Sequence, residues 1–462
     1  MTYDYLKLDY NSDTPLYQQL YLTIKSAIEK GHLKKGDKLP SIRKLAEDLK
    51  LSCTTIETSY QQLCVEGYLV SKPKRGYFVL PNVEDDTKPQ KPPKFEIKAK
   101  VNNKILYNFG SDCVDSENID IKVWRRHIRD ILNRQEIIAS YGKHQGEPEL
   151  RKALSEYSYG VRGVVASPEQ IVIGAGTQPL LSILCGLLNS DFNYAAMEMP
   201  GFLQAEQVFS DCKIKVLHLP YDECGIRMDA LKESETKLLF ISPSNRIQTG
   251  LSVPMNRRFE LIKWAEENNS IIIEDDYNGE LRYKARPIPA MQSMGSEHIV
   301  YIGSFSKLLL PSVRVGYMVL PPKLLGKYLK HAKHYNQTAS KIEQLALSDY
   351  IKSGQLERQL RRLRKLYSAK SSLLIQSLKD TFGKNIEILL EETLLSVILT
   401  VKTNYSSSQI CDMAEKNGVK IMPVKNSDNI DGTAKVMLGF AGIPVCDIKP
   451  AVERLKKAWY FG

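Results

Sequence analysis

The chain has 462 residues, more than the ~250–300 at which a single hydrophobic core stops growing, so we expect more than one domain. Hydrophobic residues make up 43% and charged residues 25%, which is typical of a globular protein and excludes an intrinsically disordered one. The net charge of +11 and the isoelectric point of about 9.0 favour an acidic partner such as nucleic acid.

The sequence shows no signal for secretion, membrane insertion or disulfide bonding. The polar N-terminus has no apolar signal-peptide segment, and no uncharged apolar run reaches the ~18 residues of a membrane helix. The eight cysteines are scattered and none form a CxxC pair, which disfavours a disulfide framework or a zinc site. We therefore expect a cytoplasmic protein that contacts no membrane and binds no metal.

Three helical patterns and a hairpin pattern occupy the first 80 residues. Ser41 is the expected N-cap of the second helix, and Gly67 is expected to end the third. The helices are predicted over 15–30, 41–50 and 54–67, and the hairpin over 68–80 around a basic turn. This order predicts a winged helix-turn-helix over residues 1–80, whose recognition helix enters the major groove and whose wing follows the phosphates.

These residues resemble the GntR family of bacterial transcription regulators through PLYQQL, KKGDKLPSIRKLAEDL, SYQQLCVEGYL and KRGYFV. The resemblance implies binding to double-stranded promoter DNA. One departure is Cys53, which stands where the family usually has an arginine, so we expect a shifted site preference or weaker binding. The alternative is a helical interaction module in which Arg43 and Lys44 are a solvated face. The resemblance implies that the residues facing DNA are Ser41, Arg43, Thr54, Thr55, Tyr60, Lys74, Arg75 and Gly76.

Residues 81–104 are rich in proline and lysine and poor in large apolar residues. This composition predicts an extended, semi-rigid linker. Its expected role is to let the DNA-binding head lie on a neighbouring body, which begins at residue 105.

From residue 105 to residue 462, strand patterns alternate with helix patterns. The alternation predicts an α/β body with a largely parallel sheet that helices cover on both faces. Ligands of such sheets gather at the carboxyl ends of the strands. Side chains suited to binding follow several predicted strands: Phe202 after a Pro-Gly turn, Asn245 after LLFISPS, and Asp275, Asp276 and Tyr277 after SIIIE.

One lysine follows the apolar strand pattern IVYIG, in the stretch SFSKLLLPSVR. Ser304 and Ser306 lie close before Lys307 in the chain, and Arg314 follows one short loop later. An amine at a strand end can form a Schiff base with an aldehyde, while hydroxyls and an arginine fork suit a phosphate. An aldehyde and a phosphate on one small molecule describe pyridoxal phosphate. The alternative for this loop alone is a solvated lysine among serines.

A second phosphate signal lies in IVIGAGTQPLLSILCGLL, which is typical of a strand, a glycine turn and a helix. Backbone amides around Ala175, Gly176, Thr177 and Gln178 are expected to form an anion-binding nest at the start of that helix. A glycine turn alone is a weak signal, and its place between a strand and a helix strengthens it.

Most of residues 105–462 resemble the fold-type I aminotransferases in the order of their motifs: YG…G…LR, GAGTQ, PGF, SPSN…TG, EDDY and SFSK…R. The resemblance implies a large domain on a mainly parallel sheet and a small α+β C-terminal domain. It also implies pyridoxal 5'-phosphate bonded to Lys307, with Asp275 paired to the ring nitrogen. The other implied contacts are Tyr277 and Asn245 with the ring hydroxyl, Phe202 on the ring face, Ala175, Gly176, Thr177, Ser304, Ser306 and Arg314 with the phosphate, and Tyr141 from the partner subunit. The alternatives are exposed loop carboxylates for Asp275 and Asp276, and ordinary core packing for Phe202.

A GntR-type head on an aminotransferase-type body is the layout of the MocR subfamily. The resemblance implies a head-to-tail homodimer that regulates transcription, senses a small-molecule effector through bound pyridoxal phosphate and is not an enzyme. Two alternatives stay open. One is a working aminotransferase with an appended DNA-binding head, and the other is a DNA-binding protein whose body has lost the cofactor and only dimerises.

Two positions depart from the pattern of members that bind amino acids. Met437, in VMLGF, stands where aminotransferases place an arginine for the substrate carboxylate, and Gln204 stands where GABA-responsive members place another. The absence of these two arginine–carboxylate interactions, each worth roughly 1.5–3 kcal/mol, predicts weak binding of GABA and poor transamination. Lys435 or Arg246 could substitute, although the sequence places neither in the pocket. An effector that is pyridoxal phosphate itself, in control of vitamin B6 synthesis, needs no second carboxylate site, and an uncharged or unusual amine is the other alternative.

The last third predicts a basic helix and a small domain. The helix over 356–370 has an apolar stripe of Leu356, Leu360 and Leu363. We expect its arginines to face solvent rather than to contact DNA. The segments LLSVILTV, VKIMPV and KVMLGF predict three strands, and IKPAVERLKKAWY predicts a closing helix.

Overall fold

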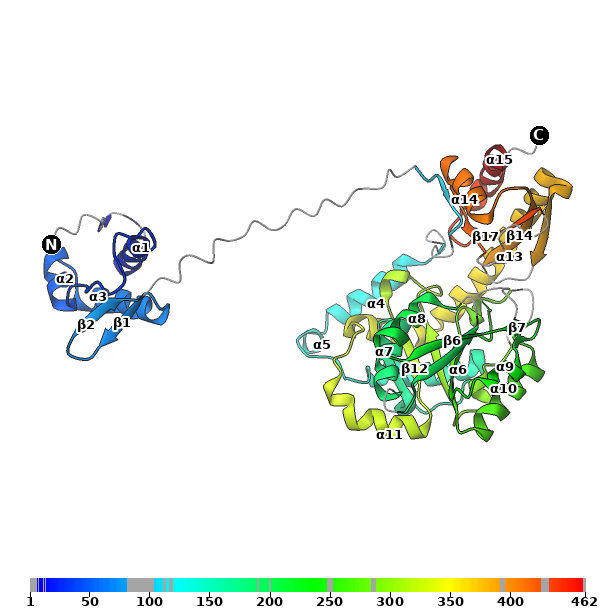
Figure 1. Cartoon of the computed structure of the whole chain (residues 1–462), viewed down its shortest axis with the longest axis horizontal. Helices are drawn as coiled ribbons and strands as arrows, with labels where there is room; N and C mark the ends of the chain where they lie inside the picture. Colours follow the sequence, from blue (N-terminus) through cyan, green and yellow to red (C-terminus); the bar gives the residue numbers. More distant parts are fainter. Residues whose placement is uncertain are drawn as a thin grey trace. The chain divides into compact units, whose positions relative to one another are not determined.

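The computed structural model divides into two compact units, Met1–Lys100 and Val101–Gly462, which are described separately (Figure 1). The predicted linker lies outside the described residues except for its last residue. The structure describes residues 6, 8–10, 12, 14–80, 104–110, 114–115, 119–188, 191–198, 201–246, 252–283, 288–390, 395–424 and 432–459.

The first unit is the winged helix-turn-helix that the sequence predicts. Ser41 caps the second helix by accepting a hydrogen bond from the Lys44 amide at 3.3 Å, and Ser52 caps the third through the Thr55 amide at 3.1 Å. Lys50, with φ 53°, ends the second helix and makes the tight turn. The elements are α1 (Leu16–Glu29), α2 (Ile42–Leu49), α3 (Cys53–Val65), β1 (Leu69–Lys72) and β2 (Gly76–Val79).

The wing is fixed to the head from both sides of its second strand. β1 and β2 pair antiparallel, and an isolated bridge joins Lys38 to Phe78. The ammonium groups of Lys38 and Lys72 lie 6.0 Å and 5.0 Å from the Phe78 ring centroid. These cation–π contacts keep both lysines beside the wing, where a basic surface would face phosphates.

The large sheet of the second unit is parallel except for one strand. Its order is β4-β12-β11-β10-β9-β5-β6, and β12 runs antiparallel to both of its neighbours. The strands are β4 (Ile171–Gly174), β5 (Tyr194–Glu198), β6 (Lys215–Leu219), β9 (Leu238–Ile241), β10 (Ile271–Asp275), β11 (Ile299–Ser304) and β12 (Gly316–Val319).

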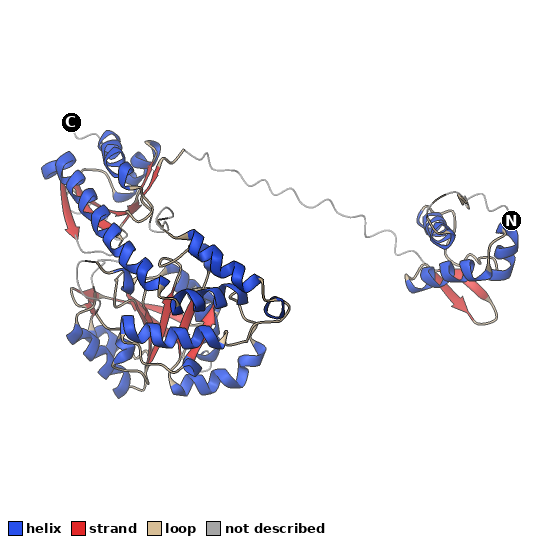
Figure 2. Ribbon diagram, turned by 180° about the vertical axis from the view of Figure 1, so that it is seen from behind, coloured by secondary structure: helices blue, strands red, loops and turns tan. Residues whose placement is uncertain are grey.

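Helices cover both faces of this sheet, as predicted (Figure 2). Neighbouring strand residues point to opposite faces. Ile273 packs into one core with α7 (Thr177–Leu188), α8 (Leu203–Asp211) and α11 (Pro322–His331), while Ile272 packs into another with α10 (Met255–Glu267). A two-stranded hairpin, β7 (Tyr221–Asp222) and β8 (Gly225–Ile226), lies beside β6 in sequence. The helices are α4 (Ile121–Leu132), α5 (Gln135–Ile138), α6 (Pro148–Arg162), α7 (Thr177–Leu188), α8 (Leu203–Asp211), α9 (Met228–Glu233), α10 (Met255–Glu267), α11 (Pro322–His331) and α12 (Lys341–Lys352).

The 28-residue helix α13 (Gln355–Phe382) leads into the small C-terminal domain. Its predicted apolar stripe is confirmed, because Leu356, Leu360 and Leu363 are buried. The small sheet has the order β13-β14-β17-β16, while β15 pairs in parallel with β3. The elements are β3 (Tyr107–Asn108), β13 (Ile386–Leu390), β14 (Ser396–Lys402), α14 (Ser407–Lys416), β15 (Val419–Lys420), β16 (Met422–Pro423), β17 (Thr433–Gly439) and α15 (Ile448–Trp459).

In two places the small domain differs from the prediction. The segment 419–424 is two short strands in different sheets, because β15 pairs with β3 and β16 with β17. β13 was not predicted. It is an edge strand of the small sheet, and its five residues, IEILL, are too few to show a clear alternation of polar and apolar side chains. In the described part of the chain, no helix combines the length and the apolar character needed to cross a membrane.

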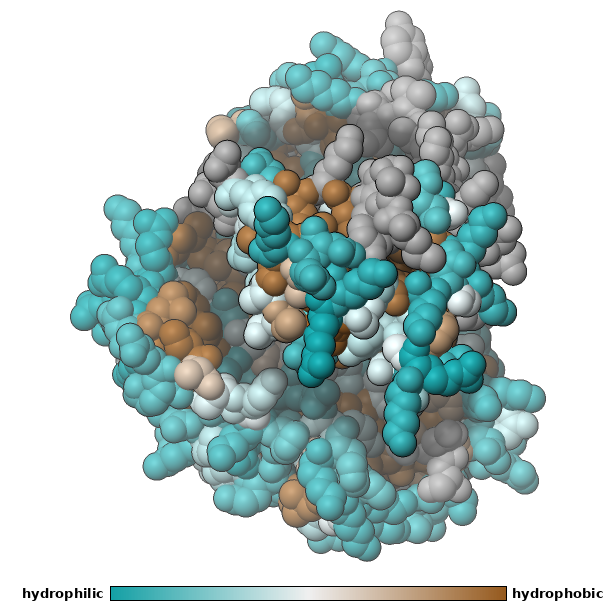
Figure 3. All heavy atoms as spheres, turned by 90° about the vertical axis from the view of Figure 1, so that its left-hand side faces the viewer, coloured by the Kyte–Doolittle hydropathy of each residue, from teal (hydrophilic) through white to brown (hydrophobic). Residues whose placement is uncertain are grey.

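The face drawn in Figure 3 is mostly hydrophilic, with separate hydrophobic patches. Among the exposed large hydrophobic side chains, Tyr141 is fully exposed and Ile138 is 48% exposed. Both precede α6 in the chain, on the segment that includes α5.

Candidate functional site

Three predicted site residues meet at one edge of the large sheet. β9, β10 and β11 are parallel neighbours, so Asn245, Asp275 and Lys307 all follow strands that end at the same edge. The Lys307 ammonium lies 5.8 Å from the centroid of the Tyr277 ring. The structure therefore brings a lysine amine, an aromatic ring and a buried carboxyl to one place.

Asp275 is a buried acid with a shifted pKa. Burial raises its pKa from the usual 3.8 to about 7, and repulsion from Asp276 adds to this effect. A hydrogen bond from Ser242 opposes the shift. The carboxyl is 7% exposed, so the alternative of an exposed loop carboxylate is wrong. A cation placed beside Asp275 would lower its pKa, and a protonated ring nitrogen is such a cation.

Asp276, the next residue, is held by a different set of partners. Although burial opposes ionisation, the Arg162 guanidinium holds the pKa of Asp276 below its usual value. Arg162 donates from Nε at 2.6 Å and from Nη2 at 3.1 Å, and the Tyr301 hydroxyl donates at 2.8 Å. A Cβ at Gly279 would lie 2.4 Å from the Asp276 carboxylate, so this pocket fits only glycine there. Asp276 is thus a structural acid, which joins the end of β10 to α6.

The predicted phosphate-binding loop contacts Arg314. The Arg314 Nη2 donates to the Ala175 carbonyl at 3.1 Å, and a Cβ at Gly176 would lie 3.0 Å from the same nitrogen. Gly316 approaches closely as well, since a Cβ there would lie 3.1 Å from the Gly176 Cα. Because Gly316 pairs with Ser304 across β11 and β12, the serine side of the lysine loop lies next to this glycine turn. Glycine is required at 176, which has φ +94° and faces a guanidinium.

Other predicted contacts of this loop are placed as follows. The Ser304 hydroxyl donates to the Ser306 hydroxyl at 3.2 Å, and both side chains are half-buried. Thr177 begins α7 and is half-buried. The sequence reasoning missed Thr338, whose Oγ1 accepts a hydrogen bond from the Ala175 amide at 3.0 Å.

Phe202 and Tyr141 have no described contact that decides their predicted roles. Phe202 caps α8 and stacks against Phe240, with ring centroids 6.4 Å apart and an interplanar angle of 15°. One face of its ring is therefore occupied by the core. Tyr141 is fully exposed, so its predicted reach into a partner subunit stays a prediction.

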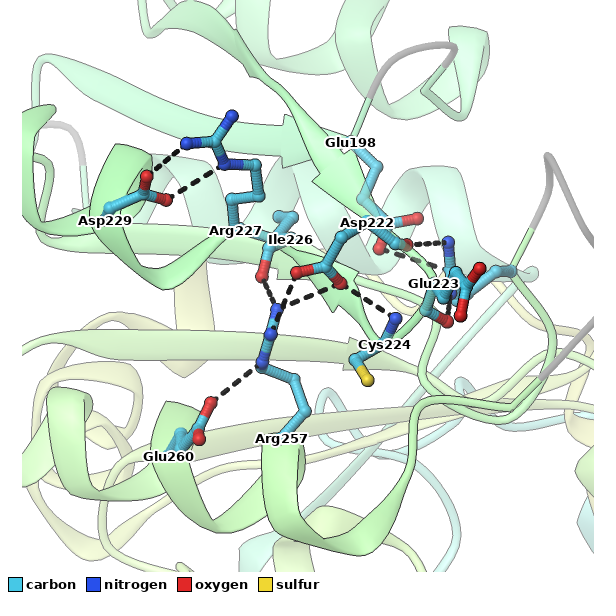
Figure 4. A network of polar contacts seen from close by, with 10 residues as sticks. Glu198, Asp222, Glu223, Cys224, Ile226, Arg227, Asp229, Arg257 and Glu260 are labelled. Atoms are coloured by element: carbon cyan, nitrogen blue, oxygen red, sulfur yellow. Dashed lines mark hydrogen bonds and ion pairs between the residues drawn. The ribbon is translucent and has the colours of Figure 1, made fainter.

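Arg246 is not free to bind a ligand carboxylate, because it is 1% exposed and its guanidinium is bonded to the β7–β8 hairpin. Its guanidinium donates to the Glu223 carbonyl at 2.7 Å and to the Asp222 carbonyl at 3.0 Å, and Nε lies 3.7 Å from Glu198. Figure 4 shows that Arg257 also holds this hairpin, through an ion pair with Asp222 at 3.0 Å. These contacts fix the loop that carries Asn245.

Met437 lies in an apolar row on one face of the small sheet. Strand register places it between Ile398 of β14 and Met422 of β16. The alternate residues Val436 and Leu438 point to the other face, into the core formed with α14 and α15. Lys435 is two residues away on the same face as Met437, and its side chain is half-buried. The position thus offers methyl and thioether groups rather than a guanidinium.

In the head, most of the predicted DNA-facing residues are exposed. Arg43 and Thr54 lie on the surfaces of α2 and α3, and Lys74 and Arg75 form the tip of the wing. Gly76, with φ +102°, begins β2. Ser41 and Thr55 are tied into the two helix caps, which leaves their side chains beside the helix starts.

The prediction that Tyr60 faces DNA is wrong. Tyr60 is 0% exposed, donates its hydroxyl to the Pro40 carbonyl at 3.1 Å and packs edge-on against Tyr77 at 4.8 Å. Its ring lies on the inner side of α3, between the turn before α2 and the wing. Tyr60 therefore orients the recognition helix from within.

Tyr60→Phe is expected to destabilise the head by about 1 kcal/mol, because the buried Pro40 carbonyl loses its donor. DNA affinity and its salt dependence should stay unchanged. Arg43→Ala is the comparison: it should leave the melting temperature alone, weaken DNA binding and reduce the salt slope by about one. Thermal unfolding and fluorescence anisotropy on a promoter fragment across a salt series measure both. A Tyr60→Phe variant that loses as much DNA affinity as Arg43→Ala would contradict the buried role.

Two family descriptions match the chain. "Bacterial regulatory proteins, gntR family" matches residues 16–79, and "Aminotransferase class I and II" matches residues 103–455. The first covers the winged head and the second covers the body, so the two resemblances found in the sequence are confirmed.

Curated relatives are similar to this chain over most of its length. The chain is 38% identical over 97% of its length to the uncharacterized HTH-type transcriptional regulator YdeL of Bacillus subtilis (strain 168), and covers 97% of that protein. It is 30% identical to the pyridoxine biosynthesis transcriptional regulator PdxR of Corynebacterium glutamicum, over 81% of each chain. It is 28% identical to the probable rhizopine catabolism regulatory protein MocR of Rhizobium meliloti, over 98% of this chain and 96% of that one.

Solved aminotransferase structures share the fold of the body. The α-aminoadipate aminotransferase LysN of Thermus thermophilus, complexed with N-(5'-phosphopyridoxyl)-L-leucine, has a TM-score of 0.67 at 24% identity, over 77% of this chain and 92% of that one. The multiple substrate aminotransferase of Thermococcus profundus has a TM-score of 0.67 at 21% identity, over 78% and 92%. The chain therefore belongs to the MocR subfamily of GntR-type transcription regulators, in which a DNA-binding head is joined to an aminotransferase-type body.

Proposed function

We propose that this regulator binds pyridoxal 5'-phosphate at Lys307 and senses a small molecule through it. The observation that carries the proposal is the meeting of Lys307, Tyr277 and buried Asp275 at one sheet edge, beside the glycine turn and Arg314. Pyridoxal 5'-phosphate supplies an aldehyde that bonds to amines and a ring that withdraws electrons. The proposed regulator acts on promoter DNA in the cytoplasm, as a head-to-tail homodimer.

The residues at this edge fit the cofactor in charge. Burial raises the pKa of Asp275. A protonated ring nitrogen beside this carboxyl would give the carboxylate a cationic partner. Arg314 and the α7 N-terminus offer positive charge to a phosphate. The proposed cofactor-binding residues are Lys307, Asp275, Tyr277, Asn245, Phe202, Gly176, Thr177, Ser304, Ser306, Arg314 and, from the partner subunit, Tyr141. Ala175 was predicted with them, but its amide already donates to Thr338 and its carbonyl accepts from Arg314.

The proposed effector is pyridoxal phosphate itself rather than an amino acid. Met437 stands in an apolar row, Gln204 carries no charge, and Arg246 is buried against backbone carbonyls. None of the three can offer a free guanidinium to a second carboxylate. The similarity to a regulator of pyridoxine biosynthesis supports the same choice. For the same reason we propose that the body does not act as a working aminotransferase.

The test is whether DNA binding depends on the lysine. Wild-type protein should gain the visible absorbance of bound pyridoxal phosphate and change its affinity for its upstream promoter when the cofactor is added. Lys307→Ala should lose both responses, because the amine that bonds the aldehyde is gone. Lys352→Ala, which removes an exposed lysine of α12, should keep both.

Two results would contradict the proposal. One is wild-type protein that stays colourless at saturating pyridoxal phosphate. The other concerns the effector: micromolar binding of GABA by the cofactor-loaded protein, measured by isothermal titration, would exclude pyridoxal phosphate as the sole signal.

A further inference from the structure

Thr338 is 163 residues away from Ala175 in the chain and contacts the proposed phosphate site directly. It lies in the loop between the short 3-10 helix Ala332–His334 and α12. Its Oγ1 accepts the Ala175 amide hydrogen bond at 3.0 Å, and a Cβ at Gly174 would lie 3.5 Å from the same oxygen. The Ala175 carbonyl is used as well, by Arg314 at 3.1 Å. The amide and the carbonyl of Ala175 are therefore both bonded within the protein. The sequence predicted that this amide binds a phosphate, but Thr338 already occupies it.

A threonine hydroxyl has one donor hydrogen in addition to its acceptor lone pairs. Because Thr338 accepts from the Ala175 amide, its own hydrogen points to another acceptor. The side chain is exposed at the start of α7, where helix amides and Arg314 favour an anion. Ala175 itself has only a methyl group to offer at this position.

We propose that Thr338 completes the phosphate site: it accepts the Ala175 amide hydrogen and donates its hydroxyl hydrogen to an oxygen of the cofactor phosphate. Thr338 replaces the amide donor that it occupies. This inference rests on the proposed binding of pyridoxal 5'-phosphate, and it adds a phosphate ligand that the sequence did not identify.

The loop that carries Thr338 is held in place by the segment before α6. The Gln337 side-chain amide donates to the carbonyls of His144 at 3.2 Å and Lys143 at 3.4 Å. The His144 ring nitrogen Nδ1 lies 2.8 Å from the Tyr335 carbonyl, and Lys341 donates to the Ser140 hydroxyl at 2.7 Å. These bonds hold the loop that carries the Thr338 hydroxyl. They also connect the proposed phosphate site to residues 140–144, which include Tyr141.

The experiment compares two ligands that differ only in the phosphate. Cofactor-free wild type, Thr338→Val and Thr338→Ser are titrated with pyridoxal 5'-phosphate and with pyridoxal, and visible absorbance reports uptake. Thr338→Val keeps the shape and removes the hydroxyl, so its affinity for pyridoxal 5'-phosphate should fall about tenfold. Its affinity for pyridoxal should stay unchanged, and Thr338→Ser should restore the binding of pyridoxal 5'-phosphate.

Equal affinity of wild type and Thr338→Val for pyridoxal 5'-phosphate would overturn the assignment. An equal loss for both ligands would overturn it too, because it would show a structural role. Thermal unfolding confirms that the variants fold, and Thr338→Ala replaces Thr338→Val if the valine variant does not. A wild type that takes up neither ligand overturns the proposed function together with this inference, which separates that failure from a failure of Thr338 alone.

Discussion

Asp275→Asn is expected to stabilise the cofactor-free protein at about pH 8 and to weaken its binding of pyridoxal 5'-phosphate. In the folded protein the carboxyl binds a proton up to about pH 7, whereas in the unfolded chain it ionises near 3.8. The folded state therefore binds more protons between these values, so the free energy of unfolding falls as the pH rises through this window. An amide has no charge to bury, and the variant should escape this loss.

The shift from 3.8 to about 7 corresponds to at most about 4 kcal/mol at pH 8, and to little near pH 4. Urea unfolding of cofactor-free wild type and Asp275→Asn across this pH range measures the difference. Cofactor affinity should fall roughly tenfold to a hundredfold, because a charge-assisted hydrogen bond to the ring nitrogen is lost. A variant that gains stability but loses cofactor affinity would show that the Asp275 carboxyl destabilises the cofactor-free fold and serves to bind the cofactor.

Glu274→Gln is the matched control. Burial also raises the pKa of Glu274 to about 7, but its two oxygens accept the amides of Met291 and Gln292 at 2.8 Å and 2.9 Å. The glutamine side chain can satisfy only one of these donors, so this variant should lose stability without changing cofactor affinity. If Asp275→Asn is no more stable than wild type at pH 8, burial does not raise the pKa of the Asp275 carboxyl.

The carboxyl ends of parallel strands could be predicted from the sequence, and with them most of the candidate site. A short apolar run followed by a polar residue, as in SIIIED or IVYIGS, fixes both the strand and the place where it ends. Lys307 and Asp275 come from adjacent strands, so a parallel sheet brings them together. The alternation of strands and helices predicted that these ends lie at one edge of a parallel sheet, while the order of the strands is known only from the structure.

Contacts between distant loops could not be predicted in this way. Thr338 follows a loop with no strand pattern, and only the folded chain shows that its hydroxyl takes the Ala175 amide. Arg246 directly follows Asn245, yet its side chain turns to the carbonyls of a hairpin about twenty residues earlier. The wrong prediction for Tyr60 has another cause, because it was taken from the family resemblance alone. The helical spacing places Tyr60 on the same inward face of α3 as the buried Ile56 and Leu63.

Arg162→Met is expected to destabilise the body by about 3–5 kcal/mol, because it leaves the Asp276 carboxylate buried without its cation. Arg162 is 2% exposed and contacts Asp276 through Nε and Nη2. Nη2 also donates to the Ser244 hydroxyl, and Nη1 donates to the Ile288 carbonyl, both at 2.7 Å. Methionine is of similar length and cannot form any of these bonds. The midpoint of urea unfolding at neutral pH measures the loss.

The double variant Arg162→Met with Asp276→Asn separates the charge from the packing. Removing the carboxylate as well should recover at least half of the lost stability, since the uncompensated charge is the larger cost. A double variant as unstable as Arg162→Met would show that the Ser244 and Ile288 contacts dominate instead. The same cycle bears on the cofactor site, because the Asp276 charge helps to raise the pKa of Asp275. In the double variant that repulsion is gone, so the pH below which Asp275 binds a proton should fall, and pyridoxal 5'-phosphate uptake should shift to lower pH with it.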